Sequence, residues 1–464
     1  MLTCFPKMVS RKAMTCYFIT LIVSSIVFLR NVLPLGMMLF GIVEVCAFFY
    51  FSTELTRRWK LLSPKALVKK LFWTALVIRL VYMVFVYFYY EAMTGRPFMY
   101  HSADEFVYYN TSKIWHDHGF NAIRMALAGS LDDSGEIYFT AFLCRIFGTY
   151  ILTARIGHSV MSALTCVLIY RIGKRHFGES TGRMAAIFCM LMPNLIYYCG
   201  LHLKEADMVF VTVLFVDAAD MLVSKRKWDW ILILLVLASG FSLFTFRSVL
   251  GAVGLLALGV ALAFHKGHIG SLWKRIALAT GIVVVLATTS IGMRIMSDID
   301  MAWSRRESNQ AQGMESRSHR GNRFAEYGTA AVFAPFIFTI PFPTMVNIEG
   351  HENQQMLHGG NFVKNVMSGF TIFALALLLL SGEWRKHTLP IAMMVGYLVV
   401  IASSNFAHSE RFHQPALPFE LLFAAFGISQ MKAKHAKWFE YWLAFLLVAD
   451  VAWAWIKLAG RGLI

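Results

Sequence analysis

The chain alternates between long apolar runs and short polar stretches along nearly its whole length. A helix that crosses the hydrocarbon core of a bilayer needs about 17–25 apolar residues, and most of these runs approach that length. The pattern therefore predicts an all-α polytopic membrane protein with about 13 transmembrane helices. The expected helices cover residues 15–30, 32–52, 71–91, 153–172, 182–199, 205–223, 230–245, 248–264, 276–293, 362–380, 389–404, 416–431 and 441–458.

The composition agrees with a membrane location. Hydrophobic residues make up 58% of the 464 residues and charged residues 15%, whereas a soluble domain carries about a quarter charged residues. The formal net charge of +16 could indicate a nucleic-acid partner. The Lys and Arg residues, however, fall in short clusters between the apolar runs, as membrane orientation requires. We therefore expect membrane lipids, and no nucleic acid, among the partners.

These basic clusters also predict the orientation of the chain. With the helices counted as above, all of them fall on one face of the membrane, which makes that face cytoplasmic. The opposite face then carries two long segments, residues 92–152 and 294–361. Within them, the apolar stretches 137–150 and 330–346 would break the alternation of charge if they crossed the membrane, so we expect interfacial or re-entrant segments there. Function is therefore expected on the outer face, facing the periplasm or the exterior of a bacterial inner membrane.

The same pattern suggests three parts of the chain. Residues 1–70 form a transmembrane hairpin with a basic cytoplasmic loop, residues 71–430 form the main transmembrane module, and residues 431–464 add a C-terminal helix. The N-terminal apolar run is expected to remain as a first helix because no small-residue cleavage site follows it. The seven cysteines occur singly, without a CxxC pair, which favours neither a zinc site nor a disulfide framework.

Two adjacent acids in the first outer segment are the strongest candidates for chemistry. Asp104 and Glu105 follow the third apolar run by about a dozen residues. They could begin a solvated loop, or one of them could serve as a general base near the membrane surface. We assign the base to Asp104, with Glu105 orienting it or binding a cation, because neighbouring side chains point in different directions.

The residues around this acidic pair offer further contacts. Tyr108 and His116 are candidates for contacting an acceptor. A divalent metal cation is the cofactor that this region could hold, with Asp104, Glu105, His116 and His118 as donors. An HxH pair without a third fixed ligand is a weak metal signal, so no cofactor is assigned.

Cationic residues recur at the outer ends of later apolar runs. Lys204 with Glu205, Arg247 and Arg411 all lie at predicted outer turns, and His413 follows Arg411 closely. Each alone could be an interfacial anchor or a surface ion pair. Several cations around one cavity would instead bind the phosphate of a lipid-linked donor, because Arg recognises phosphate with two parallel hydrogen bonds. His413 is a further candidate for contacting an acceptor or a lid.

An Arg-rich segment in the second outer stretch departs from the usual charge distribution. Arg305, Arg306 and Arg320 stand among Ser, Asn, Gln and Gly in residues 301–327. Basic residues are uncommon in outer loops. The segment either weakens the assigned orientation or forms an anion-binding lid that orders on substrate.

Several of these landmarks resemble those of a known enzyme group. Asp104-Glu105, the stretch 148–178 with Ala154-Arg155, the stretch 192–198 followed by Leu203-Lys204-Glu205, and Glu410-Arg411-Phe412 occur in the same order in GT-C membrane glycosyltransferases. The similarity is to their family-39-like members, related to protein mannosyltransferases and aminoarabinose transferases, and covers residues 70–430.

The resemblance implies a GT-C-like fold and an enzyme that moves a hexose or pentose from a polyprenyl-phosphate donor to a lipid, glycan or protein acceptor. It implies that Asp104, with Glu105 beside it, is the catalytic acid pair. Phosphate-binding roles carry over to Lys204, Arg247 and Arg411. One displacement at the anomeric carbon would invert its configuration.

Two other functions compete with this one. A polysaccharide polymerase or ligase using lipid-diphosphate-linked glycans would also use outer-face arginines. A lipid or solute transporter would instead show repeated halves and polar sites near the bilayer midplane. The distinctive residues here gather at one predicted face, which favours an enzyme.

Overall fold

The computed structural model describes residues 3–119, 132–224, 229–264, 336–402, 409–432 and 435–464, with a few isolated positions between these ranges. Helices are the regular elements of these ranges, and one isolated bridge pairs Val32 with Val346. The helices are α1 (Lys7–Val27), η1 (Leu29–Asn31), α2 (Leu35–Arg58), η2 (Trp59–Leu61), α3 (Pro64–Thr94), α4 (Ala103–His118), α6 (Ser134–Phe147), α7 (Ile151–Phe177), α8 (Glu179–Leu191), α9 (Pro193–Cys199), α10 (Glu205–Ser224), α11 (Trp230–Phe246), α12 (Ser248–Phe264), α17 (Glu352–Met356), α18 (His358–Leu380), η4 (Glu383–Lys386), α19 (Thr388–Ala402), α20 (Glu410–His413), α21 (Leu417–Gln430) and α22 (Ala436–Ala459).

Membrane-crossing helices are present among these elements. Five helical stretches in the described ranges are long and apolar enough to cross a bilayer: Leu35–Leu61, Pro64–Thr94, Ile151–Phe177, His358–Leu380 and Lys437–Ala459. Shorter apolar helices include α11, α12, α19 and α21. The prediction of an all-α membrane protein is confirmed, while the count of about 13 transmembrane helices stays a prediction. The predicted span 276–293 lies outside the described residues apart from isolated positions.

The predicted span 182–199 is not one helix. The chain breaks at Met192, between α8 and α9, because Pro193 has no N–H to donate and restricts the residue before it to an extended conformation. Pro193 then starts α9 at a position where a missing N–H carries no cost. The turn between Cys199 and Glu205 leads directly into α10. This break therefore places the Lys204-Glu205 pair at a helix start.

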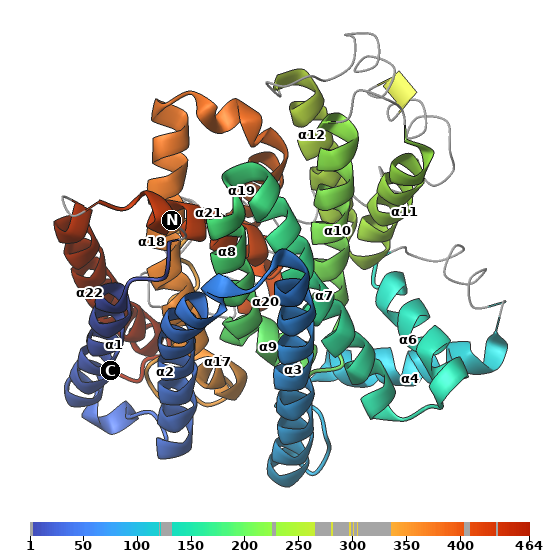
Figure 1. The fold of residues 1–464 in the computed structure, drawn as a ribbon. Helices are drawn as coiled ribbons and strands as arrows, with labels where there is room; N and C mark the ends of the chain where they lie inside the picture. Colours follow the sequence, from blue (N-terminus) through green and yellow to red (C-terminus); the bar gives the residue numbers. More distant parts are fainter. Residues whose placement is uncertain are drawn as a thin grey trace.

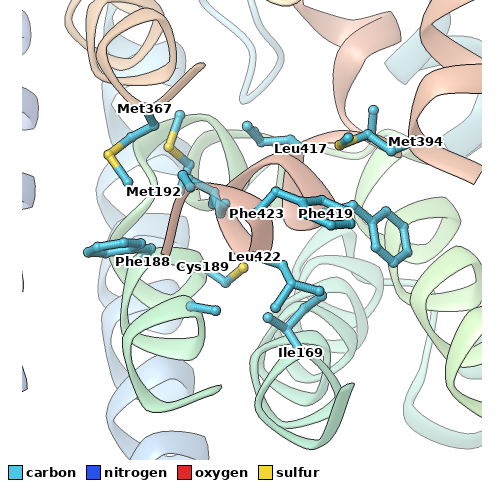
Figure 2. Close-up of a cluster of buried hydrophobic side chains, with 14 of the residues drawn as sticks. Ile169, Phe188, Cys189, Met192, Met367, Met394, Leu417, Phe419, Leu422 and Phe423 are labelled. Atoms are coloured by element: carbon cyan, nitrogen blue, oxygen red, sulfur yellow. The ribbon is translucent and has the colours of Figure 1, made fainter. Parts of the chain in front are cut away.

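A close-packed apolar core surrounds α21. Figure 2 shows Phe419, Leu422 and Phe423 of α21 beside side chains from α7, α8, α18 and α19. Helices α18 and α21 approach so closely that a Cβ added at Gly427 would lie 2.3 Å from the backbone oxygen of Phe370. Glycine is the residue that permits this approach. The packing fixes α21, and with it α20 just before it in the chain.

The terminal helices share this core. Helix α1 packs on α2 and α22, and α2 packs on α8 and α18 (Figure 1). An ion pair between Lys12 and Glu440 joins α1 to α22. One continuous hydrophobic cluster includes buried residues from Phe5 to Trp453. The N-terminal hairpin and the C-terminal helix therefore pack as parts of the same body as the central helices.

Two helices form a layer at one end of the bundle. Helices α4 and α6 pack on each other near the end of α3 and the beginning of α7 (Figure 1, lower right). The stretch 137–150 forms most of α6, as a helix separate from α7. In contrast, residues 340–346 of the stretch 330–346 form no helix, and Ile340, Thr344 and Val346 are buried. Such irregular backbone is tolerated at membrane depth where protein covers it.

Candidate active site

The centre of the site is an ion-paired triad from three separate elements. Arg411 in α20 donates from Nε to a carboxylate oxygen of Glu205 and from Nη1 to a carboxylate oxygen of Asp104. Asp104 and Glu205 each lie in the first turn of a helix, α4 and α10, where the helix dipole favours negative charge. The Glu205 side chain is fully buried, whereas 51% of the Asp104 side chain is exposed. The triad thus reaches from the protein interior to solvent.

The two acids determine the charge state of Arg411. Burial by itself lowers the pKa of this guanidinium, but the carboxylates of Glu205 and Asp104 outweigh burial and raise the pKa further above its usual value. Arg411 is therefore a fixed cation. A guanidinium has five N–H donors in a planar fork, so two ion pairs leave donors for a further oxygen ligand.

Glu105 faces away from this triad although it follows Asp104 directly. Its carboxylate is fully buried and accepts hydrogen bonds from the backbone N–H groups of Met99 (2.7 Å) and His202 (2.6 Å). The Arg155 guanidinium donates to it as well, at 3.3 Å. Glu105 therefore ties the start of α4 to α7 and to the turn before α10. Its contacts are those of a positioning residue rather than of a group open to substrate.

Lys204 is buried next to the triad in an ion pair of its own. Its ammonium donates to a carboxylate oxygen of Asp133 and, at 2.8 Å, to the backbone oxygen of Phe246. Burial and the nearby charge of Arg247 lower the pKa of Lys204, and Asp133 counteracts them. Asp133 is thus the partner of a buried cation. Lys204 joins the beginnings of α10 and α6 to the end of α11.

Arg247 lies at the junction of α11 and α12 and faces α19 and α20. It donates from Nη1 to the hydroxyl of Tyr397 at 2.9 Å, and its guanidinium carbon lies 4.2 Å from the centroid of the Phe412 ring. A cation over an aromatic face is attracted by the ring quadrupole. Because Phe412 follows Arg411 in α20, Arg247 packs on the short helix that carries Arg411.

The other predicted site residues lie in different surroundings. Tyr108 is buried near the triad, where burial and the charge of Asp133 raise the pKa of its hydroxyl. His116 contacts the exposed Asp117 at 3.0 Å, further along α4. His413 is buried, with Nδ1 at 3.2 Å from Nζ of Lys364. The predicted lid residues lie outside the described residues: Arg305, Arg306 and Arg320.

One family model matches part of the chain. Residues 136–292 match the family model described as dolichyl-phosphate-mannose-protein mannosyltransferase. The resemblance to GT-C membrane glycosyltransferases is confirmed. The match covers Lys204, Glu205 and Arg247 of the site.

A solved structure, that of ArnT from Cupriavidus metallidurans in the apo state, is also similar to this chain. Its sequence is 13% identical, and the superposition covers 83% of this chain and 70% of that chain with a TM-score of 0.46. No curated protein matches the chain.

An apolar pocket of about 400 Å³ opens beside the candidate site. It lies between α6, α10 and α11, and Phe246, whose backbone oxygen binds Lys204, is part of its wall. Aromatic side chains dominate the lining, including Tyr138, Phe142 and Phe241. The pocket is therefore suited to a hydrocarbon chain whose polar end reaches the cations.

Sequence reasoning missed a group of buried polar residues near the site. The polar turn around Asp132 and Asp133 predicts a solvated Glu136, Arg155 is predicted only to pair with other helix residues, and no role is predicted for His158. The grouping with metal-ligand spacing among the described residues is Glu136, His158 and Asp207. The donors predicted from the first outer segment do not form such a group there. The signal that could have found this group is His158, an ionisable residue inside the apolar run 153–172. An ionisable residue at such a position by default indicates a functional site.

Proposed function

We propose that this protein is a membrane glycosyltransferase that moves a sugar from a polyprenyl-phosphate-linked donor to a hydroxyl of a lipid, glycan or protein acceptor at the outer face. The observation that carries the proposal is the triad in which Arg411 joins the half-exposed Asp104 to the buried Glu205. The mannosyltransferase family match over residues 136–292 supports the same reaction class.

Asp104 is the proposed general base. Its carboxylate is exposed enough to meet an acceptor hydroxyl, and its pairing with Arg411 keeps it oriented. As the acceptor oxygen attacks the anomeric carbon, Asp104 takes its proton, which contributes about 10²–10⁴-fold to the rate. The sugar passes through an oxocarbenium-like transition state, and a single displacement inverts the anomeric configuration.

The cations are proposed to act on the leaving phosphate. Negative charge grows on the phosphate oxygen as the glycosidic bond breaks, and preorganised donors stabilise it best in a partly dry site. Arg411 in α20 and Arg247, which stacks on Phe412 of α20, present guanidinium groups to the same region. Glu205 holds Arg411 in place. Lys204 would bind phosphate by exchanging Asp133 for a phosphate oxygen.

The apolar pocket is proposed to receive the polyprenyl chain. Phe246, in the wall of this pocket, directly precedes Arg247 in the sequence. A lipid chain in the pocket could therefore place its phosphate near the cations. Burial of apolar surface contributes roughly 25 cal/mol per Å², so the chain would supply much of the donor's affinity.

The test is a transfer assay with purified protein in lipid vesicles. We would offer several polyprenyl-phosphate sugars, each with lipid, glycan and peptide acceptors, and identify products by mass spectrometry. We expect transfer from at least one such donor, with inversion visible by NMR of the product. Activity confined to lipid-diphosphate-linked glycans would instead establish a polymerase or ligase.

The Asp104→Asn variant tests the base directly. It should lose transfer by about 10²–10⁴-fold while still folding. Asp117→Asn is the matched control, since Asp117 is an exposed acid on the same helix, with 79% of its side chain accessible. Full activity of Asp104→Asn would reject the proposed base.

A further inference from the structure

A buried cluster of three side chains lies on helices that also carry site residues, and the proposed transfer does not use it. Glu136 of α6, His158 of α7 and Asp207 of α10 place one donor atom each within 4.8 Å of one another. All three are buried, with at most 3% of any residue exposed. We propose that they form a binding site for a divalent transition-metal ion, with Zn²⁺ as the best match.

The spacing of the donor atoms fits a tetrahedral ion, and the contact between His158 Nε2 and Glu136 Oε1 is at the same time a long hydrogen bond. His158 Nε2 lies 3.2 Å from Glu136 Oε1 and 3.4 Å from Asp207 Oδ2. Zn²⁺ binds nitrogen and oxygen at about 2.0–2.2 Å, so neighbouring ligands around it are about 3.3 Å apart. Charge-assisted hydrogen bonds between such groups are shorter, about 2.7–2.9 Å.

The surroundings hold the ligands as metal sites usually do. The other ring nitrogen of His158, Nδ1, lies 3.0 Å from the backbone oxygen of Leu201, and donation from it leaves the lone pair of Nε2 facing the two carboxylates. Thr140 donates to Glu136 Oε1 at 3.0 Å. Such outer hydrogen bonds fix the orientation of metal ligands and the tautomer of histidine.

Unsatisfied buried atoms point to a missing positive charge. Both carboxylate oxygens of Asp207 and Oε2 of Glu136 are buried without a hydrogen-bond partner among the described residues. Both ring nitrogens of His202 lack one as well, and that ring lies 6.0 Å from the His158 ring. Buried carboxylates are costly unless they are paired or bind a metal. A cation would satisfy the acids, and His202 is a further candidate donor.

A metal here would have a structural role. It would connect α6 to α7 and α10, and so would fix Asp133, three residues before Glu136, against Lys204. The inference does not depend on glycosyl transfer, because it concerns which groups hold α6 in place. A proton shared by Glu136 and Asp207 is the competing explanation, and it would leave the protein without metal.

The test measures metal in the full-length protein, purified through a tag without histidines. After incubation with ZnCl₂ and desalting, inductively coupled plasma mass spectrometry should find about one zinc per chain. His158→Gln and Asp207→Asn should lose it. His116→Gln should keep it, since His116 lies on α4 beside Asp117. Folded protein that remains free of zinc would overturn the proposal, as would zinc retained in both variants.

A second measurement does not require the variants to fold. Wild-type protein loaded with Co²⁺ should show the intense visible absorption of a four-coordinate nitrogen and oxygen site. Addition of excess Zn²⁺ should abolish that absorption, and chelation should lower the melting temperature. Absence of the four-coordinate spectrum in folded protein would contradict the proposed site.

Discussion

Asp104 and Glu105 occupy consecutive positions in the first turn of α4, but their side chains lie in different environments. Consecutive residues in an α-helix point about 100° apart around the axis, so one carboxylate reaches solvent while the next is buried. Asp104 meets Arg411 at the surface of the site, and Glu105 meets Arg155 in the interior. One acid is thus available for chemistry because the other holds the helix in place.

Removing the charge of Glu105 should affect stability more than chemistry. Glu105→Gln leaves Arg155 buried opposite a neutral group, and breaking a buried ion pair in this way costs about 3–5 kcal/mol. We expect a clearly lower melting temperature for Glu105→Gln than for Asp104→Asn, measured on detergent-purified protein. Equal melting temperatures would contradict the positioning role of Glu105.

The shape of the Arg411 side chain should matter as well as its charge. Arg411→Lys keeps one positive charge but cannot bind Glu205, Asp104 and a phosphate oxygen through one planar fork. We expect kcat/KM for the lipid-linked donor to fall by roughly 10²-fold. Arg96→Lys, at an exposed position just after α3, should leave it unchanged. A fully active Arg411→Lys variant would show that the planar guanidinium group of Arg411 is not required for transfer.

At the scale of elements, the close contact between α18 and α21 positions α20. Gly427 allows the approach, because a Cβ there would lie 2.3 Å from the backbone oxygen of Phe370. Arg411 in α20 is only a few residues before α21, so a shift of α21 would move the triad.

A pair of glycine substitutions tests this packing. Gly427→Ala should lower the melting temperature and the transfer rate together, because a backbone atom must move to admit the methyl group. Gly259→Ala in α12 is the control, since nothing lies within 4 Å of a Cβ added there. The control should be neutral or more stable, by up to about 1 kcal/mol, because Ala favours helix over Gly. A melting temperature unchanged by Gly427→Ala would show that the contact is dispensable.

At the scale of the whole molecule, the orientation in the membrane decides where the site faces. Basic residues accumulate in cytoplasmic loops, and the short loops with Arg57, Arg58 and Lys60 lie at the opposite ends of α2 and α3 from the outer segment that begins near Arg96. We therefore expect the triad to face the outside.

Cysteine labelling tests this orientation. In intact cells, a membrane-impermeant maleimide should label Arg96→Cys and should label Leu61→Cys only after permeabilisation. Both positions are exposed in the structure. The unsubstituted chain, with its seven native cysteines, measures the background. The reverse pattern would place the site on the cytoplasmic face.

The hydrophobic pattern of the sequence predicted some helices of the structure and missed some of their boundaries. The apolar runs indicated the long apolar helices such as α2, α3, α7 and α18, because avoidance of water is a property of each run by itself, whereas the more polar α4 and the short α17 and α20 were not among the predicted spans. The break before Pro193 was missed as a boundary, although proline there signals it. The outer helix α6 was expected as a separate segment from the charge alternation alone.

The sequence by itself determined that the chain is a helical membrane protein and that acids and cations gather at the ends of its helices. Only the tertiary structure decided which of them meet: Arg411 with Asp104 and Glu205, Lys204 with Asp133, and His158 with Glu136 and Asp207. The reason is that hydrophobic periodicity records which positions leave water, whereas the pairing of buried charges depends on how distant helices pack.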